Sequence, residues 1–256
     1  MIGHLRRGRG LSVLILMTVL LLGGASFANS ARQGQGRFAE AELFFELNDT
    51  DGDLGIHSSI DGQPWTNLKI EDANGRVLLN IVSNGRLRDQ GLTQLFFESA
   101  EPSFDVLEPA DFFSRFPAGR YEIEALLHGG GALESVAVLS HVLAAPPENI
   151  LVSGVPAAES CDVEPLPLVS PPVIIRWDPV TASHPEIGAR GPIKVSRYQL
   201  FVERPGVKLS LDLPPTVTEF EVPTGVTALG KEFKFEIIVR TTAGNNTAIE
   251  SCFRVP

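Results

Sequence analysis

A short stretch in the C-terminal half, Val173–Pro179, is the feature that most constrains the fold of this chain. The large apolar residues Val173, Ile175 and Trp177 recur at every second position, which is the period of a strand that buries one face. Pro179 ends the strand because proline has no N–H group to donate to a neighbouring strand. A buried tryptophan early in a series of about seven short strands is typical of a two-sheet sandwich. The sequence therefore predicts an all-β fold.

Further segments of the same half support this interpretation. Ile175-Arg176-Trp177-Asp178-Pro179 resembles the second strand of a fibronectin type III domain. Leu229–Phe235 is similar to the segment that leads into the sixth strand of that family, and the turn Ala243–Asn246 continues the resemblance. Phe235 stands where the family usually has tyrosine, so the hydroxyl bond of the tyrosine corner would be missing. The resemblance implies seven strands of fibronectin type III or immunoglobulin-like architecture and no catalytic residues. The strands are expected near 149–154, 172–177, 196–203, 207–212, 217–222, 232–240 and 247–254.

The N-terminal half also shows strand patterns, and we expect it to form a β-sandwich domain with one short helix. Asp72-Ala73-Asn74-Gly75 separates two alternating segments, and Asn-Gly is a strong hairpin signal. A helix is expected over 108–116, because Pro109 suits a first helical turn and Pro117 ends the pattern. Phe112, Phe113 and Phe116 on this helix are interpreted as core residues. Other strands are expected at 41–47, 65–71, 76–82, 95–98, 120–127 and 132–143.

Composition marks the domain boundaries. The small polar segment 29–37 predicts a disordered lead-in, and Pro146-Pro147 predicts a semi-rigid linker at 145–147. The expected organisation is therefore a signal peptide at 1–28, a sandwich domain at 38–144, and a fibronectin type III-like domain at 148–256. The two halves differ in charge, because residues 29–146 carry a net −10 and residues 147–256 a net −3.

The N-terminus predicts export. Arg6, Arg7 and Arg9 precede an apolar run from Leu11 to Leu22, and small residues follow up to Ala28. This is the order of a secretory signal peptide, with cleavage expected after Ala28 and no membrane insertion afterwards. An uncleaved membrane anchor is the alternative, although the run is short for a span of about 20 residues. The expected location is therefore the periplasm or the outside of the cell.

The net charge of −10 limits the possible partners. Removal of residues 1–28 leaves the remaining chain at −13, since that segment holds three arginines and no acidic residue. Nucleic acid and an anionic membrane surface are therefore not expected partners.

An acidic turn holds the candidate metal ligands. Asp49, Asp51 and Asp53 alternate beside Gly52, and carboxylates in such a turn can converge on calcium. The turn departs from an EF-hand loop, since Leu54 stands where glycine is required and Ile60 where the bidentate glutamate belongs. A solvated turn held by its own side-chain hydrogen bonds remains the alternative. No other cofactor is indicated.

Cys161 and Cys252 are the two cysteines of the chain. In an oxidising compartment we expect them to form a disulfide that ties the segment before the tryptophan strand to the last strand. Two reduced, buried thiols that act as small apolar side chains are the alternative.

The sequence carries no recognisable catalytic motif. It has no Gly-x-Ser-x-Gly elbow, no His-Glu-x-x-His helix and no phosphate-binding loop, and its histidines are scattered. Trp65 follows Gly62-Gln63-Pro64 and is the one candidate for an exposed aromatic platform that could stack on a sugar. We therefore expect a non-catalytic binding or spacer protein whose partner is a protein or a cell-envelope component. The alternative is an enzyme, or an enzyme accessory, that acts on extracellular polysaccharide through the N-terminal domain.

Overall fold

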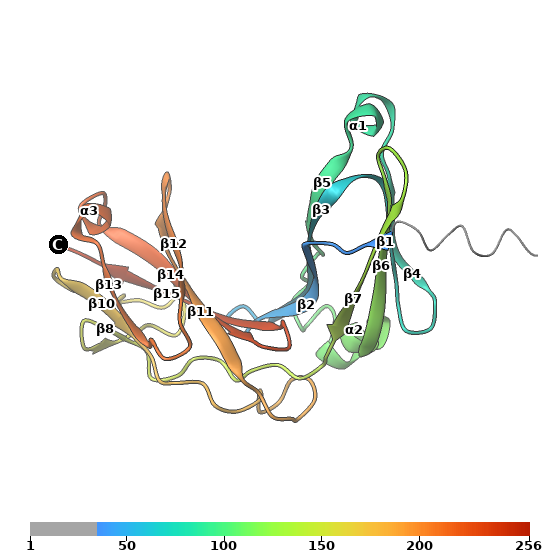
Figure 1. Ribbon diagram of the computed structural model, residues 1–256. Helices are drawn as coiled ribbons and strands as arrows, with labels where there is room; N and C mark the ends of the chain where they lie inside the picture. The colour runs from blue at the N-terminus through green and yellow to red at the C-terminus, as the bar shows by residue number, and fades with distance from the viewer. Residues whose placement is uncertain (1–34) are drawn as a thin grey trace, which may run out of the picture. The chain divides into compact units, whose positions relative to one another are not determined.

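The computed structural model describes residues 35–256, which form one compact unit. The predicted signal peptide and its cleavage site at Ala28 lie outside the described residues. The described part is built almost entirely of β-strands (Figure 1), so the all-β sandwich expected from the sequence is confirmed. Among these residues no helix is both long and apolar enough to cross a membrane.

Nine elements belong to the N-terminal half. They are β1 (Gln35–Gly36), β2 (Glu40–Asn48), β3 (Asp53–Glu71), β4 (Val77–Val82), α1 (Gly85–Gln90), β5 (Leu92–Glu98), α2 (Pro109–Arg115), β6 (Gly119–Leu127) and β7 (Ala132–Leu139).

 Two short strands follow, β8 (Leu151–Val152) and β9 (Val155–Pro156). They are grouped with the C-terminal half, because β8 pairs with β10 (Val173–Arg176) and β9 pairs with β8. The helix α1 has no counterpart among the expected segments.

The C-terminal half continues with strands that match the expected positions closely. They are β10 (Val173–Arg176), β11 (Val195–Arg204), β12 (Val207–Leu213), β13 (Glu219–Val222), β14 (Glu232–Thr241) and β15 (Asn246–Arg254). One short helix that no sequence pattern predicted, α3 (Thr224–Thr227), lies between β13 and β14.

Two sheets contain all of these strands. The larger one has the order β1-β7-β6-β3-β2-β15-β14-β11-β12, with β4 and β5 also paired to β3. The smaller one has the order β13-β10-β8-β9 and packs against the C-terminal part of the larger sheet to complete a sandwich. The larger sheet runs through both halves because β2 lies beside β15 (Figure 1).

Strand β3 is far longer than the expected strand 65–71, and it changes partners midway. Its first part pairs with β2 and β5, and its second part pairs with β4 and β6. The register shifts between Asp61 and Trp65, which bends the strand at this point. Gly62 occupies the bend, where a Cβ atom would lie 2.8 Å from Leu133 and 3.0 Å from Phe38. Only glycine allows this close approach.

The hydrophobic core has two parts. One surrounds Trp65 and Phe45 in the N-terminal half, and the other surrounds Trp177 and Phe235 in the C-terminal half. The chain passes from the first core to the second between Leu143 and Ala144. The division into two domains with a linker at 145–147 stays a prediction, because the larger sheet continues across both cores.

Several local expectations are confirmed and one is corrected. The segments around Asp72–Gly75 pair as a hairpin, and Phe112 and Phe113 of α2 are buried in the N-terminal core. The lead-in was expected to stay disordered up to residue 37, but Gln35 and Gly36 pair with β7 as strand β1. A two-residue parallel pairing carries too weak a sequence pattern to be recognised.

A tyrosine corner is present in the half where it was not expected. The hydroxyl of Tyr121, at the start of β6, donates to the carbonyl oxygen of Pro117 at 2.9 Å. Burial raises the pKa of Tyr121 to about 12, so the hydroxyl keeps its proton. At the position expected from the family resemblance, Phe235 is fully buried and offers no such bond.

Candidate ligand-binding groove

The junction of the two halves is a short parallel strand pair. Glu46, Leu47 and Asn48 of β2 lie beside Asn246, Thr247 and Ala248 of β15. Antiparallel neighbours surround this pair, so the junction is a local exception in an otherwise mainly antiparallel sheet. The pairing brings the first long strand of the described chain against the last one.

Asn245 fixes the junction. It lies in the turn between β14 and β15 and is 1% exposed. Its Oδ1 accepts a hydrogen bond from the backbone N–H of Phe45 at 3.0 Å, and its Nδ2 donates to the carbonyl oxygens of Ser140 and Val142. One side chain of the C-terminal half therefore satisfies three backbone groups of the N-terminal half. The next-but-one residue, Thr247, donates through its hydroxyl to the carbonyl oxygen of Ala144 at 2.9 Å.

A groove of about 460 Å³ lies on one face of the larger sheet at this junction. Strand alternation explains its lining, because every second residue of each strand faces it. It collects side chains from β2, β3 and β5 of the N-terminal half and from β11, β12, β14 and β15 of the C-terminal half. Its lining residues include Glu40, Glu42, Glu46, Glu98, Glu236, Phe44, Phe96, Phe201, Arg240 and Asn246.

The positive charges of the groove already have partners. Arg240 is 6% exposed and its guanidinium lies 2.5 Å from the carboxylate of Glu42. Lys208 lies 3.4 Å from Glu203, which stands outside the lining. Arg197 lies 3.4 Å from Asp212, another residue outside it.

Several of the carboxylates have no such partner. Among residues 35–256, Glu40, Glu98 and Glu236 form no ion pair and accept no side-chain hydrogen bond. Burial and the nearby negative charges of Glu46 and Glu250 raise the pKa of Glu236 to about 7. An excess of unneutralised acid therefore lines the groove.

Further acidic side chains, Asp53 and Glu101, lie near the groove at the same junction. Burial and the charge of Glu101 raise the pKa of Asp53 to about 6, and Glu250 and Glu46 add to the effect. Burial lowers the pKa of His57, but its hydrogen bond to Glu101 and the charges of Glu46 and Glu98 outweigh this and raise it above the usual value. The imidazole Nε2 of His57 lies 2.8 Å from Glu101 Oε1.

Asn246, which lines the groove, carries an unpaired oxygen atom. The residue is 3% exposed, and its Nδ2 donates to Glu46 Oε2 at 2.6 Å. This bond fixes the orientation of the amide, because a carboxylate cannot donate to the amide oxygen. The Oδ1 atom is buried and has no hydrogen-bond partner within the described residues. An unpaired buried acceptor costs free energy.

Three aromatic rings complete the lining. Arg240 lies over the ring of Phe44 at 4.5 Å, and Lys208 lies over that of Phe201 at 4.4 Å. Phe96 on β5 differs from them, because its side chain is 65% exposed and no cation of the described chain lies over it. The groove thus offers one exposed aromatic ring next to unneutralised carboxylates.

The acidic turn does not form the expected metal cluster. Asp49 Oδ1 lies 2.9 Å from Nε2 of His184, and Asp51 accepts a hydrogen bond from Asn48 at 3.2 Å. Within residues 35–256, no group of three Asp, Glu, His or Cys side chains is placed to hold a metal ion. The turn is instead held by Asn48, whose Oδ1 accepts from the backbone N–H groups of Thr50 and Asp51.

The other two predicted sites have clear positions. Cys161 and Cys252 form a disulfide, with Cα atoms 4.9 Å apart. Trp65 is fully buried in the N-terminal core, so the expectation of an exposed platform is wrong. The preceding Gly62-Gln63-Pro64 segment suggested a surface turn, but it is the bend of β3 and directs the tryptophan inward.

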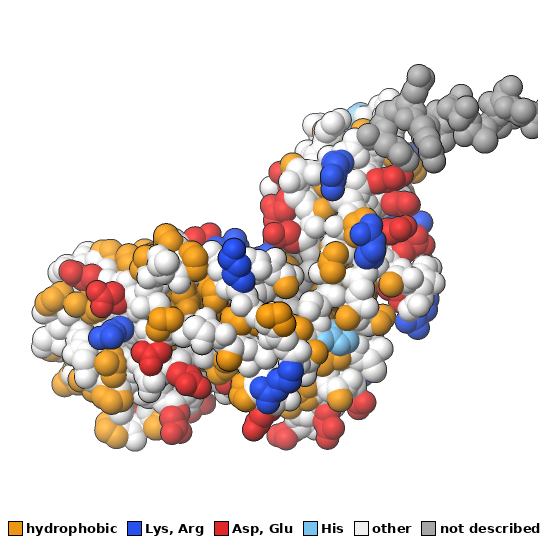
Figure 2. Space-filling view, turned by 60° about the horizontal axis from the view of Figure 1, so that its bottom comes forward, with side chains coloured by type: hydrophobic (Ala, Val, Ile, Leu, Met, Phe, Trp, Pro, Cys, Tyr) orange, Lys and Arg blue, Asp and Glu red, His pale blue; other side chains and the backbone are white. Residues whose placement is uncertain are grey.

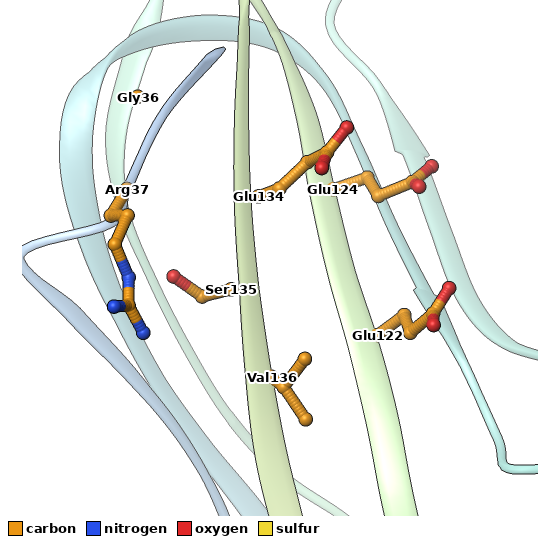
Figure 3. A pocket seen from close by; sticks show the side chains of 7 residues that line it. All are labelled: Gly36, Arg37, Glu122, Glu124, Glu134, Ser135 and Val136. Carbon is orange, nitrogen blue, oxygen red and sulfur yellow. The ribbon is translucent and has the colours of Figure 1, made fainter.

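A second acidic hollow lies on the outer strands of the N-terminal half. It has a volume of about 420 Å³ and is lined by Glu122 and Glu124 of β6, Glu134 of β7 and Arg37 (Figure 3). Acidic side chains are also frequent over the N-terminal half in Figure 2, in agreement with its larger negative charge. This hollow carries no unpaired buried polar atom among its described lining residues.

Comparisons with known proteins identify no family. No family model and no curated protein matches the chain. Among solved structures, a tetra-tandem repeat from the extending region of a large adhesion protein matches at 11% identity with a TM-score of 0.28, over 84% of this chain and 49% of that one. A two-domain fibronectin type III segment of chicken tenascin matches at 11% identity with a TM-score of 0.25, over 85% of this chain and 98% of that one.

A calcium-stabilised adhesin that helps an Antarctic bacterium bind ice matches at 11% identity with a TM-score of 0.26, over 87% of this chain and 49% of that one. The chain spans about half the length of the two adhesin chains.

Proposed function

We propose that this chain is an exported, non-catalytic binding protein whose ligand site is the groove at the junction of its two halves. The observation that carries the proposal is the composition of the groove, to which strands of both halves contribute side chains. A site of about 460 Å³ is within the usual size range of ligand pockets. Export is supported by the signal-like N-terminus and by the disulfide.

The junction supports the same proposal. Asn245, Thr247 and Arg240 of the C-terminal half all bond to groups of the N-terminal half, and most of these contacts are buried. Contacts of this kind keep the two sides of the groove in one arrangement before a ligand arrives. A preformed site loses less conformational entropy on binding.

Export and binding can be tested together. The protein produced with its own N-terminus should be recovered from the periplasm or the medium, and its N-terminal sequence should begin at Asn29. Purified protein should then co-sediment with isolated cell envelopes. A double variant in the groove, Phe96→Ala with Glu98→Gln, should reduce the bound fraction, whereas the exposed pair Val138→Ala with Glu219→Gln should not. Equal sedimentation of both variants would contradict the proposed site.

An enzyme that acts on extracellular polysaccharide is the second candidate. The observation in its favour is Glu236, a carboxyl whose raised pKa of about 7 would suit a general acid beside other carboxylates in a groove. The purified protein should then release reducing ends from envelope polysaccharide, and Glu236→Gln should abolish that release. Unchanged polysaccharide after long incubation would contradict the enzymatic function and leave ligand binding as the function of the groove.

A further inference from the structure

We propose that the junction is a pH-sensitive hinge, which is closed at acidic pH and loosens as the carboxylates on its two sides become charged. This goes beyond the proposed function, because it concerns how the two halves are joined and requires no ligand. It rests on the shortness of the parallel strand pair and on acidic side chains from both halves that lie beside it.

The junction is short compared with the strand pairs on either side of it. β2 and β15 pair over three residues each, Glu46–Asn48 beside Asn246–Ala248. By contrast, β2 pairs with β3 over nine residues, and β14 pairs with β15 over nine. Local opening costs less free energy where fewer backbone hydrogen bonds must break. The parallel pair alone is therefore weaker than the antiparallel pairs beside it, and its closure depends more on the side chains around it.

Acidic side chains face one another on the groove side of the sheet. Glu236 of β14 and Glu250 of β15 are register partners, so their side chains lie directly opposite on the same face. Glu46 of β2 is the register partner of Gly55, and the carboxylate of Glu101 lies where a Cβ atom of Gly55 would be. Each pair becomes unfavourable when both of its carboxylates are charged.

Acidic groups of the two halves also act on each other across the junction. Burial, and then the charges of Glu46 in the N-terminal half and of Glu250, raise the pKa of Glu236 in the C-terminal half to about 7. Burial and the charges of nearby acids, among them Glu250 in the C-terminal half, raise the pKa of Asp53 in the N-terminal half to about 6. Opening of the junction moves these groups apart and relieves the repulsion.

Positive charges offset this repulsion only in part. Lys234 and Lys208 lower the pKa of Glu236, but burial and the neighbouring acids outweigh them. The charged groups that shift the pKa of Asp53 are all acidic. The groups that act on the two carboxylates are Glu46, Glu250, Lys234 and Lys208 for Glu236, and Glu101, Asp51, Glu250 and Glu46 for Asp53.

His57 adds to the same pH dependence. Burial lowers its pKa, but the hydrogen bond to Glu101 and the nearby negative charges outweigh this and raise it. A group whose pKa is raised in the folded state stabilises that state at low pH and stops doing so as pH rises through the raised value. For Asp53 and Glu236 this loss occurs from about pH 6 through about pH 7. All three groups lose a proton as pH rises, so each makes the junction more negative and easier to open.

Native-state amide hydrogen exchange of the exported chain tests the hinge. Protection factors, which correct for the intrinsic effect of pH on exchange, should be measured from pH 5 to pH 8 in low urea. The N–H groups that bond across the junction should lose protection by about tenfold or more over this range, because relief of one pKa unit in total is a tenfold change. Ile123 on β6 and Val202 on β11 serve as references within one half each. The N–H groups across the junction are those of Asp49, bonded to the carbonyl oxygen of Ala248 at 2.9 Å, Phe45, bonded to Asn245 Oδ1 at 3.0 Å, and Glu250, bonded to Thr50 Oγ1 at 2.8 Å.

Urea separates opening of the hinge from unfolding of the whole chain. Opening at the junction exposes little surface, so exchange across it should respond weakly to urea. Exchange at Ile123 and Val202 should respond with the steeper slope of global unfolding. Equal slopes at both sets of N–H groups would show that the junction opens only when the whole chain unfolds, and would overturn the proposal. Protection across the junction that is the same at pH 5 and pH 8 would overturn it as well.

Variants that cannot become charged assign the effect to the two carboxylates. Asp53→Asn together with Glu236→Gln should reduce the loss of protection between pH 5 and pH 8 to about threefold or less, with the remainder due to His57. Glu236→Gln alone should give an intermediate loss, which keeps the test decisive if the double variant does not fold. Glu219→Gln, at an exposed position of β13, is the matched control and should keep the loss of the wild type. A loss as large as that of the wild type in the Glu236 and double variants would overturn the proposal.

Discussion

The side chain of Asn245 accepts a hydrogen bond from the backbone N–H of Phe45, 200 positions earlier in the sequence, at 3.0 Å. Asn245 is buried and also donates to the carbonyl oxygens of Ser140 and Val142, so its hydrogen bonds link the two halves. Its position in a turn after a long strand gives no local sign of this role. The stability of the junction depends on it.

The first prediction concerns this residue. Asn245→Ala should lower the free energy of unfolding by about 2 to 4 kcal/mol, because it leaves one N–H and two carbonyl groups without their buried partner. Urea denaturation of residues 29–256 measures the change. Asn80→Ala, at an exposed position of β4, is the matched control and should change stability by less than about 0.5 kcal/mol. Equal effects of the two changes would show that Asn245 does not hold the junction.

The second prediction concerns pH. Burial and the charges of Glu46 on β2 and Glu250 on β15 raise the pKa of Glu236 from 4.5 to about 7, while Lys234 and Lys208 only partly offset them. The folded state therefore holds this proton more tightly than the unfolded state does. The contribution of Glu236 to stability is present below pH 4.5 and is lost as pH rises through about 7.

Glu236→Gln removes this titration. The variant should be more stable than the wild type at pH 8, by roughly 1 to 3 kcal/mol, and close to it at pH 4. Denaturant melts at a series of pH values test this, with Glu219→Gln as an exposed control that should show no trend. A stability difference that does not vary with pH would refute the raised pKa.

The third prediction concerns the disulfide. Cys161 and Cys252 close a loop with a sequence separation of 91 residues. The chain-entropy model gives a stabilisation of about 4 kcal/mol for a loop of this length, so reduction should lower the midpoint of urea unfolding markedly. Mass analysis without a reductant should find no free thiol in exported protein. Two alkylated cysteines in material that melts like the reduced form would show that the bridge does not form in the cell.

The fourth prediction concerns calcium at the acidic turn. Asp49 is engaged by His184 and Asp51 by Asn48, so these carboxylates are not free to converge on an ion with Asp53. Millimolar calcium should therefore leave the melting temperature unchanged. A rise that magnesium does not reproduce, and that Asp51→Asn abolishes, would restore the calcium site expected from the sequence.

Local patterns in the sequence predict much of the fold. The alternation around Trp177, the Asn74-Gly75 turn and the proline at the start of α2 each act within a few residues, so each can be recognised from neighbours alone. The cysteine pair could also be predicted, since the chain holds only two.

The features that create the groove could not be predicted in this way. The bend of β3 depends on the close contact of Gly62 with Leu133, far along the chain. The burial of Trp65 follows from that bend. The hydrogen bond between Asn246 and Glu46 joins residues 200 positions apart. No periodicity encodes such contacts, because they arise only when separate elements pack together. The sequence does contain one indication of the groove, because acidic residues are frequent on alternate positions of 40–46. This pattern indicates a polar face of a sheet, but it does not identify the neighbouring strands.

The parallel pairing of β2 with β15 has a consequence for the order in which the chain can fold. Glu46 is synthesised 200 residues before its neighbour Asn246, which corresponds to roughly 10 to 40 seconds of translation. Throughout that interval the segment Glu46–Asn48 of β2 has one edge without a partner, and such edges recruit other chains. The N-terminal half therefore keeps this unpaired edge until the last strand has been synthesised, and it is most prone to aggregate during that time. Protection of the edge during synthesis determines the fraction of chains that fold.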